Sequence, residues 1–166
     1  MMKQFKTLFV AALILFSTSQ AMAQTKIAHV DTNEIMSKMP AMLDAQKQLE
    51  NLGKKYDDDF RVMVEEYQAK LKKYDAESAT VSDKTNEDRA KEVQDMEKRI
   101  QDFRQNAQKE LSQKEQDLVK PLMDKARAAI EKVGKAKGYQ YVLDSSGLLL
   151  ADGPDLTTDI KKELGF

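Results

Sequence analysis

The sequence has no cysteine and no tryptophan, and it has one histidine among its 166 residues. Without cysteine no disulfide can form, so the fold must be stabilised by packing, by oligomerisation or by both. With His29 as the lone imidazole and no thiol, one chain cannot build a zinc site or a Ser-His or Cys-His catalytic pair. The sequence therefore predicts no enzyme activity, no metal site and no cofactor, and His29 is expected to pack in a strand at a subunit junction.

Three further features are absent or scarce. There is no excess of basic residues, because lysine and arginine total 27 against 28 for aspartate and glutamate, so no basic field for nucleic acid is expected. No glycine-rich loop that could cradle the phosphates of ATP is found. Aromatic residues are few, with five tyrosines and six phenylalanines, which argues against one compact core. These features leave binding and structural roles that need neither nucleic acid nor ATP.

Residues 1–23 have the pattern of a cleavable signal peptide. Lys3 and Lys6 precede an apolar run over residues 7–16, and Ala21-Met22-Ala23 places small residues around a cleavage site before Gln24. The apolar run has about ten residues, whereas a helix that spans a bilayer needs roughly 20. We expect export, cleavage, and a mature chain whose contact with membranes is at most peripheral.

The first segment of the mature chain, residues 24–40, is expected to be a strand followed by a short helix. Residues 26–31 form a short β-prone run. Asp31 and Glu34 then have the spacing of a capping box, which marks a helix start. Pro40 should end this short helix, because proline lacks a backbone donor and disfavours helix in the residue before it.

Residues 41–138 are expected to form an antiparallel helical hairpin, or arm. Apolar residues recur at steps of three and four over residues 42–74 and again over residues 93–133, which predicts one apolar stripe on each of two long helices. The stripe is lost over the acidic stretch 75–92, which is interpreted as the tip of the arm. At about 1.5 Å per residue, helices of roughly 40 residues would extend on the order of 60 Å. Pro121 interrupts the second helix where the stripe continues, so we expect a kink or hinge there.

The last segment, residues 139–166, should complete a small body with residues 24–40. Gly138 ends the arm, and strand-like runs at 139–144 and 148–151 flank Ser145-Ser146-Gly147, which predicts a β-hairpin. Asp155 should cap a last helix over residues 156–164. A β-rich body of about 50 residues is marginal alone, so its apolar strands should bury against other copies of the chain. The expected interface residues are Ile27, Val30, Tyr141, Leu143, Leu148, Leu149 and Leu150.

The chain contains, in this order, the strand motif Lys-Ile-Ala-His-Val-Asp, two charged helices with a proline in the second, and the run Gly-Tyr-Gln-Tyr-Val-Leu-Asp. This arrangement resembles the Skp/OmpH family of periplasmic chaperones. The resemblance covers the whole mature chain. It implies a mainly α fold with a small β body and a jellyfish-like homotrimer, in which three helical tentacles surround a cavity. It also implies that the cavity holds unfolded outer-membrane β-barrel proteins in the periplasm and prevents their aggregation.

Two alternatives follow for the large side chains of the stripes. They can pack between the two helices of the arm, or those at its edges can make many weak contacts with unfolded clients, which soft methionine and amphipathic tyrosine suit. The candidate client-binding residues are Tyr56, Phe60, Met63, Tyr67, Tyr74, Met96 and Phe103.

The tip departs from the family pattern. Well-studied members have basic tips, whereas residues 75–92 here carry six acidic side chains against three basic ones, which argues against attraction to anionic lipid. The alternative function is a structural coiled-coil spacer or adaptor of the cell envelope. In that case residues 75–92 would continue as helix and the chain would form a rod.

Overall fold

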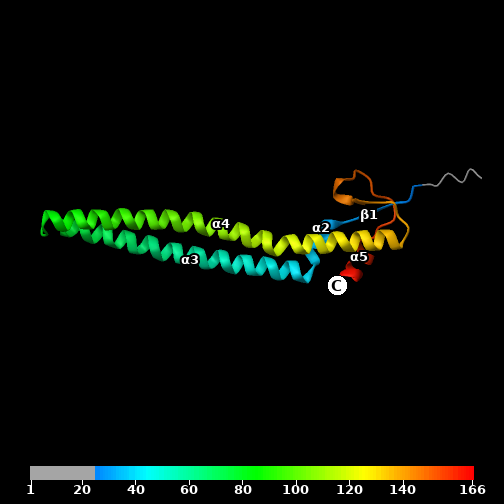
Figure 1. Ribbon diagram of the computed structural model, residues 1–166, viewed down its shortest axis with the longest axis horizontal. Helices are drawn as coiled ribbons and strands as arrows, with labels where there is room; N and C mark the ends of the chain where they lie inside the picture. Colours follow the sequence, from blue (N-terminus) through cyan, green and yellow to red (C-terminus); the bar gives the residue numbers. More distant parts are fainter. Residues whose placement is uncertain (1–24) are drawn as a thin grey trace, which may run out of the picture.

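The computed structural model describes residues 25–166, so the predicted signal peptide lies outside the described residues. A long hairpin of two helices extends from a small body at one end, and both ends of the described chain lie in that body (Figure 1). The prediction of a mainly helical fold with a small sheet is confirmed. The elements are β1 (Ile27–Val30), α2 (Thr32–Lys38), α3 (Pro40–Glu77), α4 (Asp83–Ala136), β2 (Tyr141–Asp144), the 3-10 turn η1 (Ser145–Gly147) and α5 (Thr157–Leu164).

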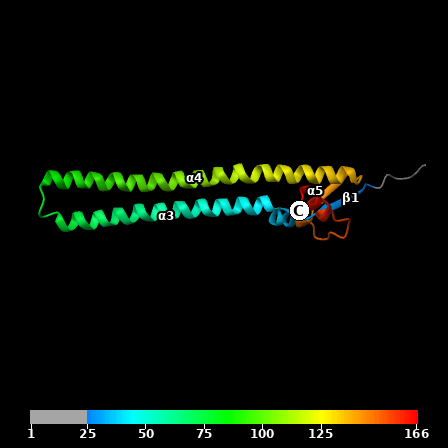
Figure 2. The same cartoon turned by 90° about the horizontal axis from the view of Figure 1, so that it is seen from below.

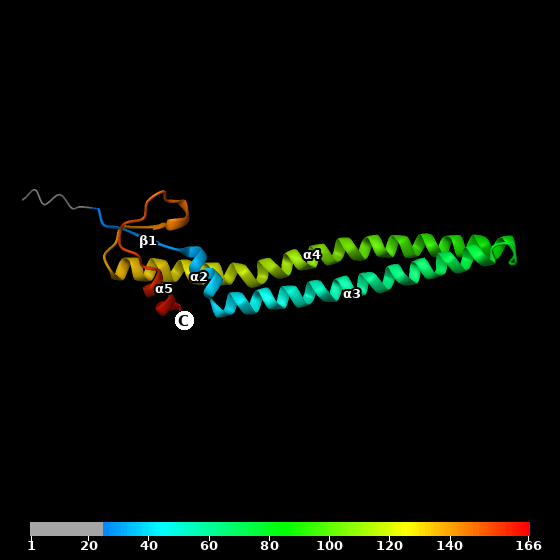
Figure 3. The same cartoon turned by 180° about the vertical axis from the view of Figure 1, so that it is seen from behind.

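Local signals set the path from β1 into the arm. The Asp31 side chain accepts a hydrogen bond from the Glu34 backbone amide at 2.8 Å, as the capping-box spacing predicts. Met39 then takes an extended conformation, and Pro40 stands at the first position of α3, where its missing amide hydrogen costs nothing. The chain therefore bends between α2 and α3 (Figure 3).

The arm consists of α3 and α4, which run antiparallel and lie side by side along α3, while the last part of α4 continues past the start of α3 into the body (Figure 2). The chain reverses over residues 78–82, inside the predicted tip. Helix α4 begins at Asp83, because the Ser82 side chain accepts a hydrogen bond from the Thr85 amide and caps the helix. The premise of the rod alternative, continuous helix through residues 75–92, is therefore wrong.

The second half of α4 passes through Pro121 without ending and continues to Ala136, as predicted. Gly138 follows the helix with a φ of 75°, in the left-handed region that glycine adopts at little cost. That conformation turns the chain back from the arm into the body.

The sheet of the body has two strands in parallel order, with Ile27 opposite Tyr141 and Val30 opposite Asp144. The predicted β-hairpin is wrong. Residues 145–147 form a 3-10 turn, in which the Leu148 amide donates to the carbonyl of Ser145, and residues 148–151 form no strand.

The other edge of β1 explains this difference. The His29 amide donates to the carbonyl of Pro154, and the Leu156 amide donates to the carbonyl of His29, both at 2.9 Å. Residues 154–156 thus occupy the edge of β1 opposite β2, in a parallel bridge centred on Asp155. The leucine run at 148–150 is left to form the connection between the two segments.

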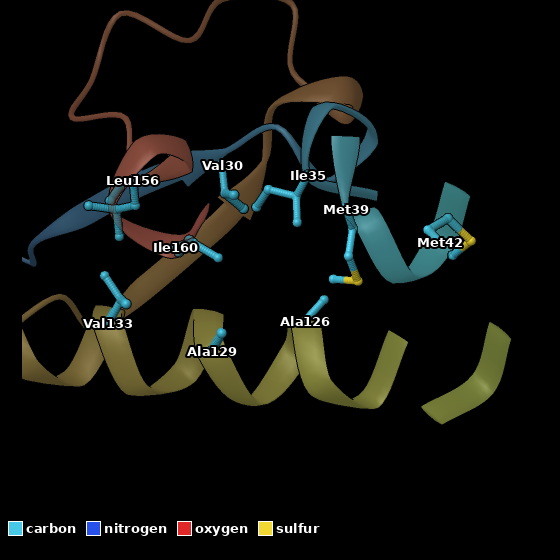
Figure 4. Packing of buried hydrophobic residues seen from close by; sticks show 10 residues of the cluster. Val30, Ile35, Met39, Met42, Ala126, Ala129, Val133, Leu156 and Ile160 are labelled. Atoms are coloured by element: carbon cyan, nitrogen blue, oxygen red, sulfur yellow. The ribbon is translucent and has the colours of Figure 1, made fainter. Parts of the chain in front are cut away.

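The hydrophobic core lies between the sheet, α2, α5 and one face of α4 (Figure 4). The α4 face is lined with small residues, Ala126 and Ala129, which let Ile35 and Ile160 approach and become fully enclosed. Gly134 extends the same face, because a Cβ there would lie 2.9 Å from Cγ2 of Val142. Val30 is 2% exposed within this core, so the structure corrects its assignment to a surface between subunits.

The last helix begins at Thr157, one residue later than predicted. The Asp155 carboxylate accepts hydrogen bonds from both the amide and the hydroxyl of Thr157, so it does hold the start of α5. The hydroxyl of Thr157 in turn accepts a bond from the Asp31 amide at 2.9 Å, which joins the starts of α2 and α5.

Candidate functional site

The inner seam of the arm is the first candidate site. All seven predicted client-binding residues lie along it, on the facing sides of α3 and α4. Six are half-buried and Met96 is 5% exposed, so Met96 is enclosed between the helices. Two helices cannot enclose side chains of this size from all directions, and the large apolar groups therefore keep part of their surface in solvent. The half-buried members are Tyr56, Phe60, Met63, Tyr67, Tyr74 and Phe103.

In the middle of the seam, the rings of Tyr56 and Phe103 meet edge to face, with their centroids 5.9 Å apart and their planes at 75°. The Tyr56 hydroxyl donates a hydrogen bond to Glu110 on α4. This bond to a carboxylate raises the pKa of Tyr56 above its usual value. Tyr56 thus contributes an apolar ring to the seam and a polar contact at its edge.

Near the tip, charged groups close the seam. Arg89 lies over the ring of Tyr74, with Cζ 4.5 Å from the ring centroid, and its guanidinium pairs with Glu77. The Tyr74 hydroxyl and Lys70 both donate to Glu92, and the bond from Lys70 holds the pKa of Glu92 below its usual value. Two of the acidic groups of the tip, Glu77 and Glu92, are thereby engaged within the arm.

The outer face of the sheet is the second candidate site. Along β1 and β2, side chains alternate between the core and solvent, as expected for a sheet with one covered face. Ile27, Tyr141 and Leu143 lie on the uncovered face and are exposed, Tyr141 to 58%. In the connection that follows η1, Leu149 and Leu150 are 109% and 81% exposed, while Leu148 is half-buried. This group is named the apolar body face: Ile27, Tyr141, Leu143, Leu149 and Leu150.

His29 is held within its own subunit. Its Nε2 lies 3.0 Å from the carbonyl oxygen of Gly153, and its Nδ1 lies 4.0 Å from a carboxylate oxygen of Asp155. The side chain is mostly buried, and it fastens the segment before α5 to β1. Over residues 25–166 there is no cluster of three or more histidine, aspartate and glutamate side chains placed to hold a metal ion. In the same part of the chain, no helix has the length and apolar character needed to cross a membrane.

Sequence reasoning missed a groove in the seam. It has a volume of about 450 Å³ and opens between Gly53 of α3 and Ala107 of α4, beside the Tyr56 and Phe103 rings. The apolar spacing within one helix does not reveal this groove, because residues of both helices line it. The register of the hairpin is needed to place Gly53 and Ala107 in the same groove.

A long hairpin of charged helices, mounted on a small body with parallel strands and an apolar outer face, defines a class of fold. The family model described as "Outer membrane protein (OmpH-like)" matches residues 26–164. The chain belongs to this family.

Relatives agree with this assignment. The chain is 27% identical over 145 residues to Chaperone protein Skp of Photorhabdus laumondii, a match that covers 87% of this chain and 88% of the relative. It is 33% identical over 140 residues to an uncharacterized protein of Aquifex aeolicus, with 82% and 84% of the two chains covered. A crystal structure of an OmpH-like protein from Caulobacter crescentus CB15 has the same fold, with a TM-score of 0.76 at 18% identity over 84% of this chain and 83% of that one.

Proposed function

We propose that the mature chain is an ATP-independent periplasmic holdase, which binds unfolded outer-membrane proteins between the arms of a homotrimer and prevents their aggregation. Membership of the OmpH-like family supports a chaperone role, and a relative that matches over most of its length is named Chaperone protein Skp. The finer claims, a holdase mechanism and a trimer with an enclosed cavity, rest on the two apolar surfaces described above.

The observation that carries the proposal is the half-buried seam of the arm. Its aromatic and methionine side chains are held in place by the second helix yet keep part of their surface in solvent. Such a surface can make many weak contacts with varied apolar segments, which suits a protein that must bind unrelated unfolded chains. The charged remainder of the arm keeps it soluble when no client is bound.

The apolar body face supports assembly. Five large apolar side chains of the sheet and of the connection after η1 are exposed in the small body, and within residues 25–166 the outer edge of β2 has no paired strand. Exposed patches of this kind mark association sites more often than free surface. Burial of this face against two other copies would bring three arms together around a shared space.

The test is suppression of aggregation. A urea-unfolded β-barrel protein is diluted into buffer with and without the mature protein, and turbidity is followed without ATP. The proposal expects suppression at about one trimer per client. It also expects replacement of Tyr67 by serine to change client affinity by no more than about 1 kcal/mol, because binding is dispersed. Aggregation at the same rate with and without the protein would refute the proposal.

A further inference from the structure

We propose that the groove over Gly53 is a binding subsite for one aromatic side chain of an extended, unfolded segment. This inference rests on the proposed chaperone function and states which client chemistry the arm selects. The groove is lined by residues of both helices. Its lining comprises Gly53, Tyr56, Asp57, Phe60, Phe103, Arg104, Ala107, Gln108 and Leu111.

Gly53 is the first observation. It lies in the interior of the 38-residue helix α3, where glycine is less favourable than alanine by roughly 0.5–1 kcal/mol. A Cβ at Gly53 would meet nothing within 4 Å. In contrast with Gly134, which Val142 crowds, no contact among residues 25–166 requires a glycine here. The missing side chain leaves open space over the backbone of α3.

The size and walls of this space favour a ring. An apolar cavity of roughly 150 Å³ accepts a benzene molecule, and this groove has about 450 Å³ and is open to solvent. A ring with its attached backbone therefore has room to enter. The edge-to-face pair of Tyr56 and Phe103 forms one wall, and a third ring can add to such a pair in the same geometry.

The rim indicates an extended backbone as the occupant, in preference to a helix. Asp57, Arg104 and Gln108 are exposed beside the half-buried rings, so one acid, one base and one amide surround the opening. Together they offer donors and acceptors with no net charge, which complements the amide and carbonyl groups on either side of a single inserted side chain. A docking helix would need a continuous apolar strip beyond the opening, and these polar residues interrupt it.

The experiment follows the Ala107 methyl group by NMR in the mature protein labelled with 13C-methyl alanine, with the exposed Ala69 methyl as reference. The probes are three capped peptides of equal length, in which threonine alternates with tyrosine, with isoleucine or with serine. We expect a saturable shift of the Ala107 signal with the tyrosine peptide, weaker binding of the isoleucine peptide, and affinity for the serine peptide lower by about tenfold or more. The Ala69 signal should stay in place.

The variant G53L fills the groove from its floor, and leucine is a better helix former than glycine. Its expected effect is a loss of about tenfold or more in affinity for the tyrosine peptide. The control A90L adds leucine at an exposed position of α4 outside the groove and should bind as the unsubstituted protein does. Circular dichroism checks that both variants keep their helices.

Two results would overturn the subsite. One is the absence of a saturable shift at Ala107, and the other is equal affinity for the tyrosine and isoleucine peptides. Either result, obtained with a protein that still suppresses aggregation of an unfolded β-barrel protein, leaves the chaperone function standing. Failure of the aggregation test alone would leave peptide binding at Ala107 unaffected, so the two proposals fail separately.

Discussion

Lys161 of α5 donates a hydrogen bond of 2.7 Å to Glu34 of α2, which joins two residues that lie 127 positions apart in the chain. Lys38 donates to the same carboxylate oxygen at 2.9 Å. These two bonds, that from Lys161 first, lower the pKa of Glu34 from 4.5 to about 2. Glu34 also lies beside the start of α2, whose backbone amides favour negative charge. One carboxylate thus ties the C-terminal helix to the helix that leads into the arm.

The Glu34 contacts should make the body sensitive to acid. Because the folded-state pKa is depressed, the stabilisation is fully present above the ordinary value of 4.5 and is lost as the pH falls toward about 2. We expect E34Q to be less stable than the unsubstituted protein at neutral pH, with the difference shrinking across this window. Thermal unfolding at several pH values measures it, with the exposed E50Q as control. A stability difference between E34Q and the unsubstituted protein that does not depend on pH would contradict the stabilising role of the Glu34 carboxylate.

Two glycines in the arm helices should respond in opposite ways to alanine. G134A places a Cβ 2.9 Å from Cγ2 of Val142, whose β-branched side chain has little rotational freedom, so we expect a loss of about 1–2 kcal/mol in the free energy of unfolding. G53A meets no neighbour and should gain roughly 0.5–1 kcal/mol. Urea unfolding measures both. The second substitution V142A should recover part of the loss in G134A, and a stabilised G134A would show that this contact is not tight.

The apolar body face should hold the oligomer together. Leu149 is fully exposed in the subunit, so L149D should leave the fold of the subunit intact. In a trimer that buries Leu149, the new carboxylate would lack a partner, at a cost of several kcal/mol. We expect L149D to dissociate, as measured by light scattering coupled to gel filtration. The control S146D places the same charge on the exposed η1 turn. An unchanged oligomer in L149D would remove this face from the proposed interface.

Pro121 is proposed as the hinge of the arm. P121A restores a backbone donor inside α4 and removes the ring, which should stiffen the helix and raise the free energy of unfolding by on the order of 1 kcal/mol. The distribution of spin-label distances between the arm and the body should become narrower, and the protein should keep a smaller range of client sizes soluble. K114A, at an exposed position on the same helix, serves as control. If the distance distribution becomes narrower while the range of client sizes is unchanged, bending at Pro121 has no part in client binding.

Features set by neighbouring residues could be predicted from the sequence. The Asp31 cap, the start of α3 at Pro40, the end of the arm at Gly138 and the two apolar stripes each depend on residues within one or two helical turns. The stripes, flanking a polar stretch, also predicted that the helices pair as a hairpin.

Features set by distant residues could not be predicted. Residues 148–151 have the composition of a strand, but residues 154–156 occupy the free edge of β1, and no local pattern reveals that competition. Ile27 and Val30 are three residues apart in β1, so strand alternation places them on opposite faces, but only the packing against α4 shows that the face of Val30 is the covered one. The groove at Gly53 likewise depends on which residue of α4 comes opposite.

The central claim is that an unfolded client is held by an oligomer of this chain. Sedimentation velocity tests it directly, with the mature protein alone and mixed with a fluorescently labelled, urea-unfolded β-barrel protein. The account predicts a trimer alone and, in the mixture, one discrete species that contains one client and one trimer, with little faster-sedimenting aggregate. A client that sediments as aggregate apart from the protein, or a protein that remains a single chain in both samples, would contradict it.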